Sequence, residues 1–99
     1  IVIDAGSITA SDAGVRLSGD ALDFTYGGTI ATSGGTARAV DAAARTAGTA
    51  TFAGAIVDTG LGIRIANNLG GTIGFAGTIN AGVSGATAPL TITGNSGGT

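Results

Sequence analysis

The sequence predicts an all-β fold in which short parallel strands coil into a β-solenoid of about four turns. Three observations support this prediction: the chain matches itself at a spacing of 22 to 28 residues, apolar residues alternate within short segments, and Gly-rich corners separate these segments. A unit of this size with such short strands cannot bury its own apolar face. Neighbouring units must therefore stack, and equivalent side chains then form ladders inside a continuous core.

The clearest repeated block is an aromatic residue, any residue, Gly, then Thr or Ala, then Ile. It occupies residues 26–30, 52–56 and 75–79, and a worn copy ends at Ile8. The block predicts two core ladders, one of Tyr26, Phe52 and Phe75 and one of Ile8, Ile30, Ile56 and Ile79. Its glycines predict a bend at which only Gly fits the crowded backbone; they are Gly6, Gly28, Gly54 and Gly77.

A second alternating block begins seven residues after the Ile of the first three copies. It covers residues 15–17, 37–39 and 63–65, and in the fourth copy a longer connection leads to residues 90–92. The outer members of these triplets predict two further core ladders, Val15, Ala37, Ile63 and Leu90, and Leu17, Ala39, Ile65 and Ile92. Residues 41–45 could form one helical turn, and we expect a decorated loop there because this corner is longer than its equivalents.

The middle residue of the second block is an arginine in three successive coils. Because Arg16, Arg38 and Arg64 lie between inward residues, we expect them to point outward and to stack in a column. Guanidinium groups pair with planar anions in a bidentate fork, so the column could bind a sulfated or acidic glycan. The alternative is a solvated face in which Asp12 and Asp58 partner the arginines.

The corners 67–72 and 94–99 align without a gap. This alignment places Asn68 and Asn95 at equivalent positions in neighbouring coils. Amide side chains in such positions can hydrogen-bond to one another along the stack. The sequence therefore predicts that these two residues begin an asparagine ladder at a turn.

Composition excludes most catalytic chemistry. The chain has no His and no Cys, and all four of its basic residues are Arg, so it lacks an imidazole base, a thiolate and a Schiff-base lysine. Its six acidic residues are all Asp, and Asp20 and Asp23 form the only close pair, with no matching acid in another coil. We therefore expect a protein that is not an enzyme and that uses neither a cofactor nor a metal.

Charge and hydropathy limit the classes of partner that we expect this chain to bind. The formal net charge of −2 is too small and too mixed to indicate a nucleic acid partner. No apolar run approaches the roughly 18 to 20 residues that span a bilayer, so we expect no membrane insertion. The chain opens and closes within the repeat pattern, and we expect residues 1–99 to be a single solenoid segment, a fragment or one unit of a longer repetitive chain.

Residues 59–79 and 90–99 resemble the beta-strand-repeat proteins of bacterial cell surfaces, which are akin to autotransporter passengers and haemagglutinin-like adhesins. The resemblance implies a right-handed parallel β-helix, secreted and extracellular, that acts as an adhesive shaft, a scaffold or a filament without catalysis. Its motifs are specific for architecture and carry no active site. The alternative is a β-helix that binds or cleaves carbohydrate, and such a domain should show clustered acids or exposed aromatic side chains.

The two ends of the sequence also match the repeat. Residues 97–99 followed by residues 1–8 reproduce residues 70–79 with one inserted residue. Joined in this way, Ile1 would occupy the position of Ile73, and Ile3 that of Phe75. The expected partner is therefore the chain itself or an adjacent repeat, stacked end to end, with a polysaccharide as a further candidate.

Overall fold

The structure is a computed structural model, and it describes residues 1–81 and 90–99. These residues form twelve strands and no helix. The strands make three parallel sheets of four strands each, so the predicted β-solenoid of about four turns is confirmed. The first sheet contains β1 (Val2–Ile3), β4 (Phe24–Tyr26), β7 (Thr49–Phe52) and β10 (Thr72–Phe75). The second contains β2 (Ser7–Ala10), β5 (Thr29–Thr32), β8 (Ile56–Asp58) and β11 (Ile79–Ala81), and the third contains β3 (Ala13–Ser18), β6 (Arg38–Ala43), β9 (Gly62–Ala66) and β12 (Leu90–Thr93).

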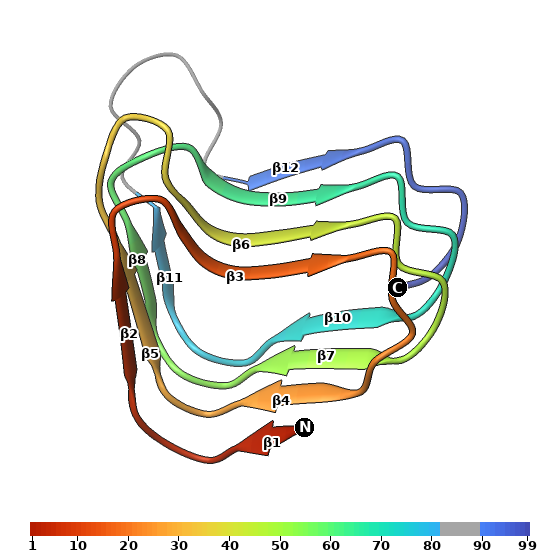
Figure 1. Cartoon of the computed structure of the whole chain (residues 1–99), viewed down its shortest axis with the longest axis horizontal. Helices are drawn as coiled ribbons and strands as arrows, with labels where there is room; N and C mark the ends of the chain where they lie inside the picture. The colour runs from red at the N-terminus through yellow and green to blue at the C-terminus, as the bar shows by residue number, and fades with distance from the viewer. Residues whose placement is uncertain (82–89) are drawn as a thin grey trace.

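Each coil contributes one strand to each sheet, as Figure 1 shows. The chain runs along the first sheet, turns through a bend into the second, passes a turn into the third, and returns through a corner to the next coil. Consecutive coils therefore pair through every strand, and the apolar core lies inside the ring of sheets. The longer connection expected before Leu90 lies outside the described residues.

Strand register confirms the isoleucine and aromatic alignments. Ile8 pairs with Ile30, Ile30 with Ile56, and Ile56 with Ile79. Tyr26 pairs with Phe52, and Phe52 with Phe75. The rings of Phe52 and Phe75 stack, with centroids 5.3 Å apart and planes 16° apart. On its other side, the Phe52 ring packs against that of Phe24, with an angle of 51° between the two planes. Tyr26 thus aligns with Phe52 in the strand register, as the ladder predicted, but its ring does not stack on that of Phe52. The Tyr26 hydroxyl instead donates a hydrogen bond to the Thr29 carbonyl.

The alignment of the second coil was wrong by three residues. Val15 pairs with Val40 and not with Ala37, and Leu17 pairs with Ala42 and not with Ala39. The additional residues lie in the turn before β6, and the register shifts again between Arg38 and Val40. The solenoid accommodates the insertion in a turn because the core ladders must stay aligned with the coils on either side.

The same shift corrects the expectation for residues 41–45. Asp41, Ala42 and Ala43 are the end of β6, and the corner begins only at Ala44, which has a φ of 56°. Asn67 occupies the equivalent position with a φ of 55°, and Gly19 and Gly94 repeat the left-handed conformation in the outer coils. The short alanine run is therefore strand followed by a sharp corner, with no helical turn.

The predicted glycine bend is confirmed by close backbone approach. A Cβ atom added to Gly54 would meet the carbonyl of Gly28, and one added to Gly77 would meet the carbonyl of Gly54. The backbone of one coil thus lies directly on that of the next at this bend. No side chain fits between them.

Candidate functional site

The expected arginine column does not form. Arg16 pairs in register with Asp41, Asp41 with Arg64, and Arg64 with Thr91, so an acid occupies the place predicted for Arg38. The Asp41 carboxylate lies 3.7 Å from Nε of Arg16 and 3.5 Å from Nη1 of Arg64. The arginines are separated and partly neutralised, which weakens this face as a site for an acidic glycan.

Arg38 lies at the beginning of β6, in register with Ala13 and Gly62. The sequence analysis assigned Arg38 to the arginine column because nothing in the sequence indicates that the turn before β6 is longer than the equivalent turns of the neighbouring coils. The anion-binding hypothesis needed three guanidinium groups in adjacent coils. The structure places only two of them, Arg16 and Arg64, on this face, and the Asp41 carboxylate lies between them.

Asp58 is not a partner of the arginines either. Its side chain is fully buried, and its Oδ2 accepts hydrogen bonds from the backbone N–H groups of Ala39, at 3.2 Å, and Gly62, at 2.6 Å. Its Oδ1 accepts a third from Gly60 at 2.7 Å. A carboxylate with three backbone donors organises the turn between β8 and β9 and ties it to β6. Asp12, the other expected partner, is exposed.

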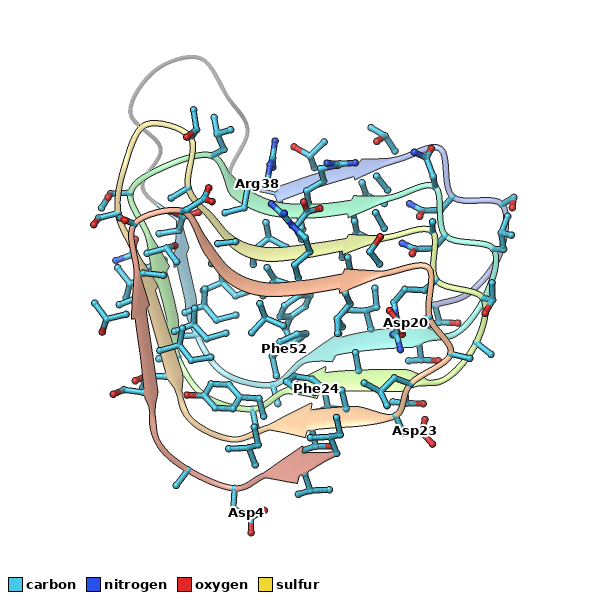
Figure 2. All side chains as sticks on the ribbon, in the orientation of Figure 1. Asp4, Asp20, Asp23, Phe24, Arg38 and Phe52 are labelled. Atoms are coloured by element: carbon cyan, nitrogen blue, oxygen red, sulfur yellow. The ribbon has the colours of Figure 1, made fainter. Side chains whose placement is uncertain are left out.

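The close carboxylate pair of the first corner serves the structure. Oδ1 of Asp20 accepts a hydrogen bond from Nε of Arg45 at 3.0 Å, and Oδ1 of Asp23 accepts one from the backbone N–H of Thr49 at 2.8 Å. Figure 2 shows Asp20 at the corner after β3, apart from Asp23. The two acids bind different groups of the next coil, so they do not form the facing pair that glycoside hydrolysis requires.

Arg45 was missed by the sequence reasoning. It is fully buried at the corner after β6, and its Nη2 also donates to the Leu22 carbonyl. The signal that could have found it is its position, because Arg45 follows Ala44 as Asn68 follows Asn67. A basic residue at an interior corner needs an acid in a neighbouring coil.

The predicted asparagine ladder is confirmed. Nδ2 of Asn68 donates to Oδ1 of Asn95 at 2.9 Å, and the backbone N–H of Asn68 donates to the same oxygen at 2.9 Å. The backbone N–H of Arg45 donates to Oδ1 of Asn68 at 2.8 Å in the same manner. Asp20, Arg45, Asn68 and Asn95 thus occupy one position in four successive coils. We call these four residues the corner ladder.

The two ends of the solenoid expose core residues. In the isoleucine ladder, Ile30 and Ile56 are 1% and 2% exposed, whereas Ile79 in the last coil is 42% exposed. Ile92, which continues the ladder of Leu17, is 61% exposed, and Ile1 at the other end is 64% exposed. In these two columns exposure is greatest in the last coil, which has a neighbouring coil on one side only, whereas Leu17 in the first coil is 8% exposed.

The exposed end of the fourth coil forms an apolar cavity of about 260 Å³. Its lining includes the apolar side chains of Ile73, Phe75, Leu90 and Ile92 and the polar side chain of Asn95. The strands β10, β11 and β12 are the outer strands of the three sheets at this end, and β1, β2 and β3 are the outer strands at the other. Each end therefore presents three parallel strand edges, and at the last coil these edges surround the cavity.

The described ranges, residues 1–81 and 90–99, contain no helix long and apolar enough to cross a membrane. Within the same ranges, no cluster of three or more acidic residues could hold a metal ion. The solenoid ends are candidate functional surfaces because they carry exposed apolar residues. Comparisons with models of protein families, with curated protein sequences and with solved structures find no match to this chain.

Proposed function

We propose that this chain is a structural repeat of a secreted bacterial cell-surface protein, in which solenoid units stack end to end into a stiff shaft. The observation that carries the proposal is the complementarity of the two ends. In the last coil, the inward residues Ile73 and Phe75 are only half-buried and line the cavity, and at the other end of the solenoid Ile1 and Ile3 are exposed. The occupant we assign to the cavity is the first coil of an identical unit.

Register within the chain supports this fit. Ile3 already pairs with Tyr26, and the Thr25 N–H donates to the Ile1 carbonyl at 2.8 Å, so β1 lies on the aromatic columns from one side. The other ends of the same columns are Ile73 and Phe75. A copy of β1 placed on β10 would therefore extend columns that its own unit also contains. Such a head-to-tail contact does not close and produces a linear assembly.

The chemistry of the described side chains favours a mechanical role over catalysis. Asp20, Asp23, Asp41 and Asp58 each bind an arginine or a backbone N–H group of the fold. These carboxylates hold coils together. The extracellular location rests on the resemblance of the repeat to bacterial surface proteins, and antibodies against the chain should label intact cells of its source organism.

The experiment that tests stacking is solution scattering from an array of eight copies, with each Thr99 joined directly to the next Ile1. Four coils at about 4.8 Å give about 19 Å per copy, so the array should scatter as a rod about 150 Å long. Fibre diffraction from aligned arrays should show a meridional reflection near 4.8 Å. These two results together indicate one continuous solenoid.

A matched pair of substitutions separates end contacts from general effects of charge. Ile92 is 61% exposed at the open end, and Val57 is 44% exposed on the outer side of the central strand β8. Ile92→Asp in every copy should convert the rod into a flexible string of units, and Val57→Asp should leave the rod intact. An unsubstituted array that scatters as a flexible string, or equal disruption by both substitutions, would contradict the proposal.

A further inference from the structure

The corner ladder has a direction. In the two central coils, the backbone N–H of the ladder residue donates to the side-chain oxygen of the next coil, from Arg45 to Asn68 and from Asn68 to Asn95. The amide Nδ2 of each asparagine also donates backwards, from Asn68 to the Ala42 carbonyl at 3.3 Å and from Asn95 to the Ile65 carbonyl at 3.2 Å. The backbone N–H donors of Arg45 and Asn68 therefore point towards the following coil.

The ladder ends on unequal chemical groups. At the last coil, the side-chain oxygen of Asn95 accepts from Asn68, and the backbone N–H of Asn95 is the donor that the pattern directs to a fifth coil. At the first coil, the ladder position holds Asp20, whose carboxylate has two acceptor oxygens and no donor. Arg45 and the backbone N–H of Leu22 donate to Oδ1 of this carboxylate.

We propose that the backbone N–H of Asn95 in one unit donates a hydrogen bond to the Asp20 carboxylate of the next unit, and that this contact sets the polarity and register of the junction. The inference rests on the proposed end-to-end stacking and names the residues that make it specific. One carboxylate oxygen faces Arg45 within its own coil pair, and the second accepts from Asn95. The acid thus receives donors from both neighbouring coils.

This arrangement selects head-to-tail stacking. If two last coils were brought together, one Asn95 would face the other, and a backbone N–H donor would meet another backbone N–H donor. Two first coils would face one Asp20 carboxylate with another, and like charges repel. Only the head-to-tail arrangement pairs a donor with an acceptor at this position.

The test uses two copies joined from Thr99 to Ile1, in which Asn95 of the first copy lies at the junction and Asn95 of the second does not. Asn95→Asp keeps the oxygen that accepts from Asn68 but places a second carboxylate against Asp20. In the first copy we expect it to raise the unfolding equilibrium constant by at least tenfold more than in the second copy. Ser96→Asp in the first copy, one residue outside the ladder, should have a small effect.

A second measurement is a double-mutant cycle with Asp20→Asn in the second copy. Removing that charge should reduce the effect of Asn95→Asp in the first copy and leave its effect in the second copy unchanged. Equal effects of Asn95→Asp in both copies, in a joined chain that still unfolds at a higher urea concentration than a single copy, would overturn this inference while stacking stands. A joined chain that unfolds like the single copy would overturn both.

Discussion

Asp20 and Arg45 form a salt bridge between the first two coils, with Nε of Arg45 3.0 Å from Oδ1 of Asp20. The Arg45 side chain is 1% exposed and that of Asp20 is 23% exposed. The cation is thus enclosed at the corner position that Asn68 and Asn95 occupy in the next two coils. Because a buried cation needs its counter-charge, we expect this pair to make a large contribution to holding the corner of the first coil against that of the second.

Asp20→Ala should therefore destabilise the isolated chain by about 3 kcal/mol or more, since it leaves the Arg45 charge buried and uncompensated. The measurement is urea unfolding followed by circular dichroism. Asp12→Ala removes the same charge from an exposed position and should change stability by less than about 0.5 kcal/mol. Similar losses for the two substitutions would show that the salt bridge does not stabilise the corner.

The aromatic ladder should lose most stability at its centre. Phe52 is 1% exposed with Phe75 stacked on one side and Phe24 on the other, so Phe52→Ala should cost about 3 to 5 kcal/mol. Phe75→Ala should cost less in a single copy because Phe75 is half-buried at the open end. Urea unfolding of the two variants tests this order, and a greater loss at Phe75 would contradict the assigned ends.

The glycine bend should tolerate no side chain. Gly54→Ala would place a methyl group on the carbonyl of Gly28, which forces the stacked backbones apart, and we expect a loss of about 2 kcal/mol or more. Gly74→Ala is the matched control, because a Cβ there meets nothing within 4 Å. It should be neutral or stabilise the protein by about 0.4 to 1 kcal/mol. Thermal unfolding of both variants checks the contrast, and equal stability would refute the close approach.

The buried carboxylate of Asp58 should be irreplaceable by an amide. Asp58→Asn keeps the shape but gives one of the two acceptor positions an NH₂ group that faces a backbone N–H. The expected loss is about 1.5 to 3 kcal/mol, in the range for hydrogen bonds to charged groups. Hydrogen exchange should show faster opening at Ala39, Gly60 and Gly62, the three donors. Unchanged protection at these amides would contradict the assigned role of Asp58.

Sequence alone determined the architecture of this protein, because repeated residues at equivalent positions can all be buried only if coils stack. The isoleucine and aromatic ladders, the glycine bend and the pair Asn68 and Asn95 were all predictable from that periodicity. Each of these features repeats a residue type along the stack, and repetition is visible in a sequence.

Tertiary structure decided the features that do not repeat. Whether the extra residues of the second coil lie before or after β6 depends on which alternative keeps Val40 and Ala42 in the core columns, and local pattern does not distinguish the two. That choice placed Asp41 between Arg16 and Arg64 and removed Arg38 from their column. The pairing of Asp20 with Arg45 likewise joins residues 25 positions apart, and only the path of the corners brings their charges together.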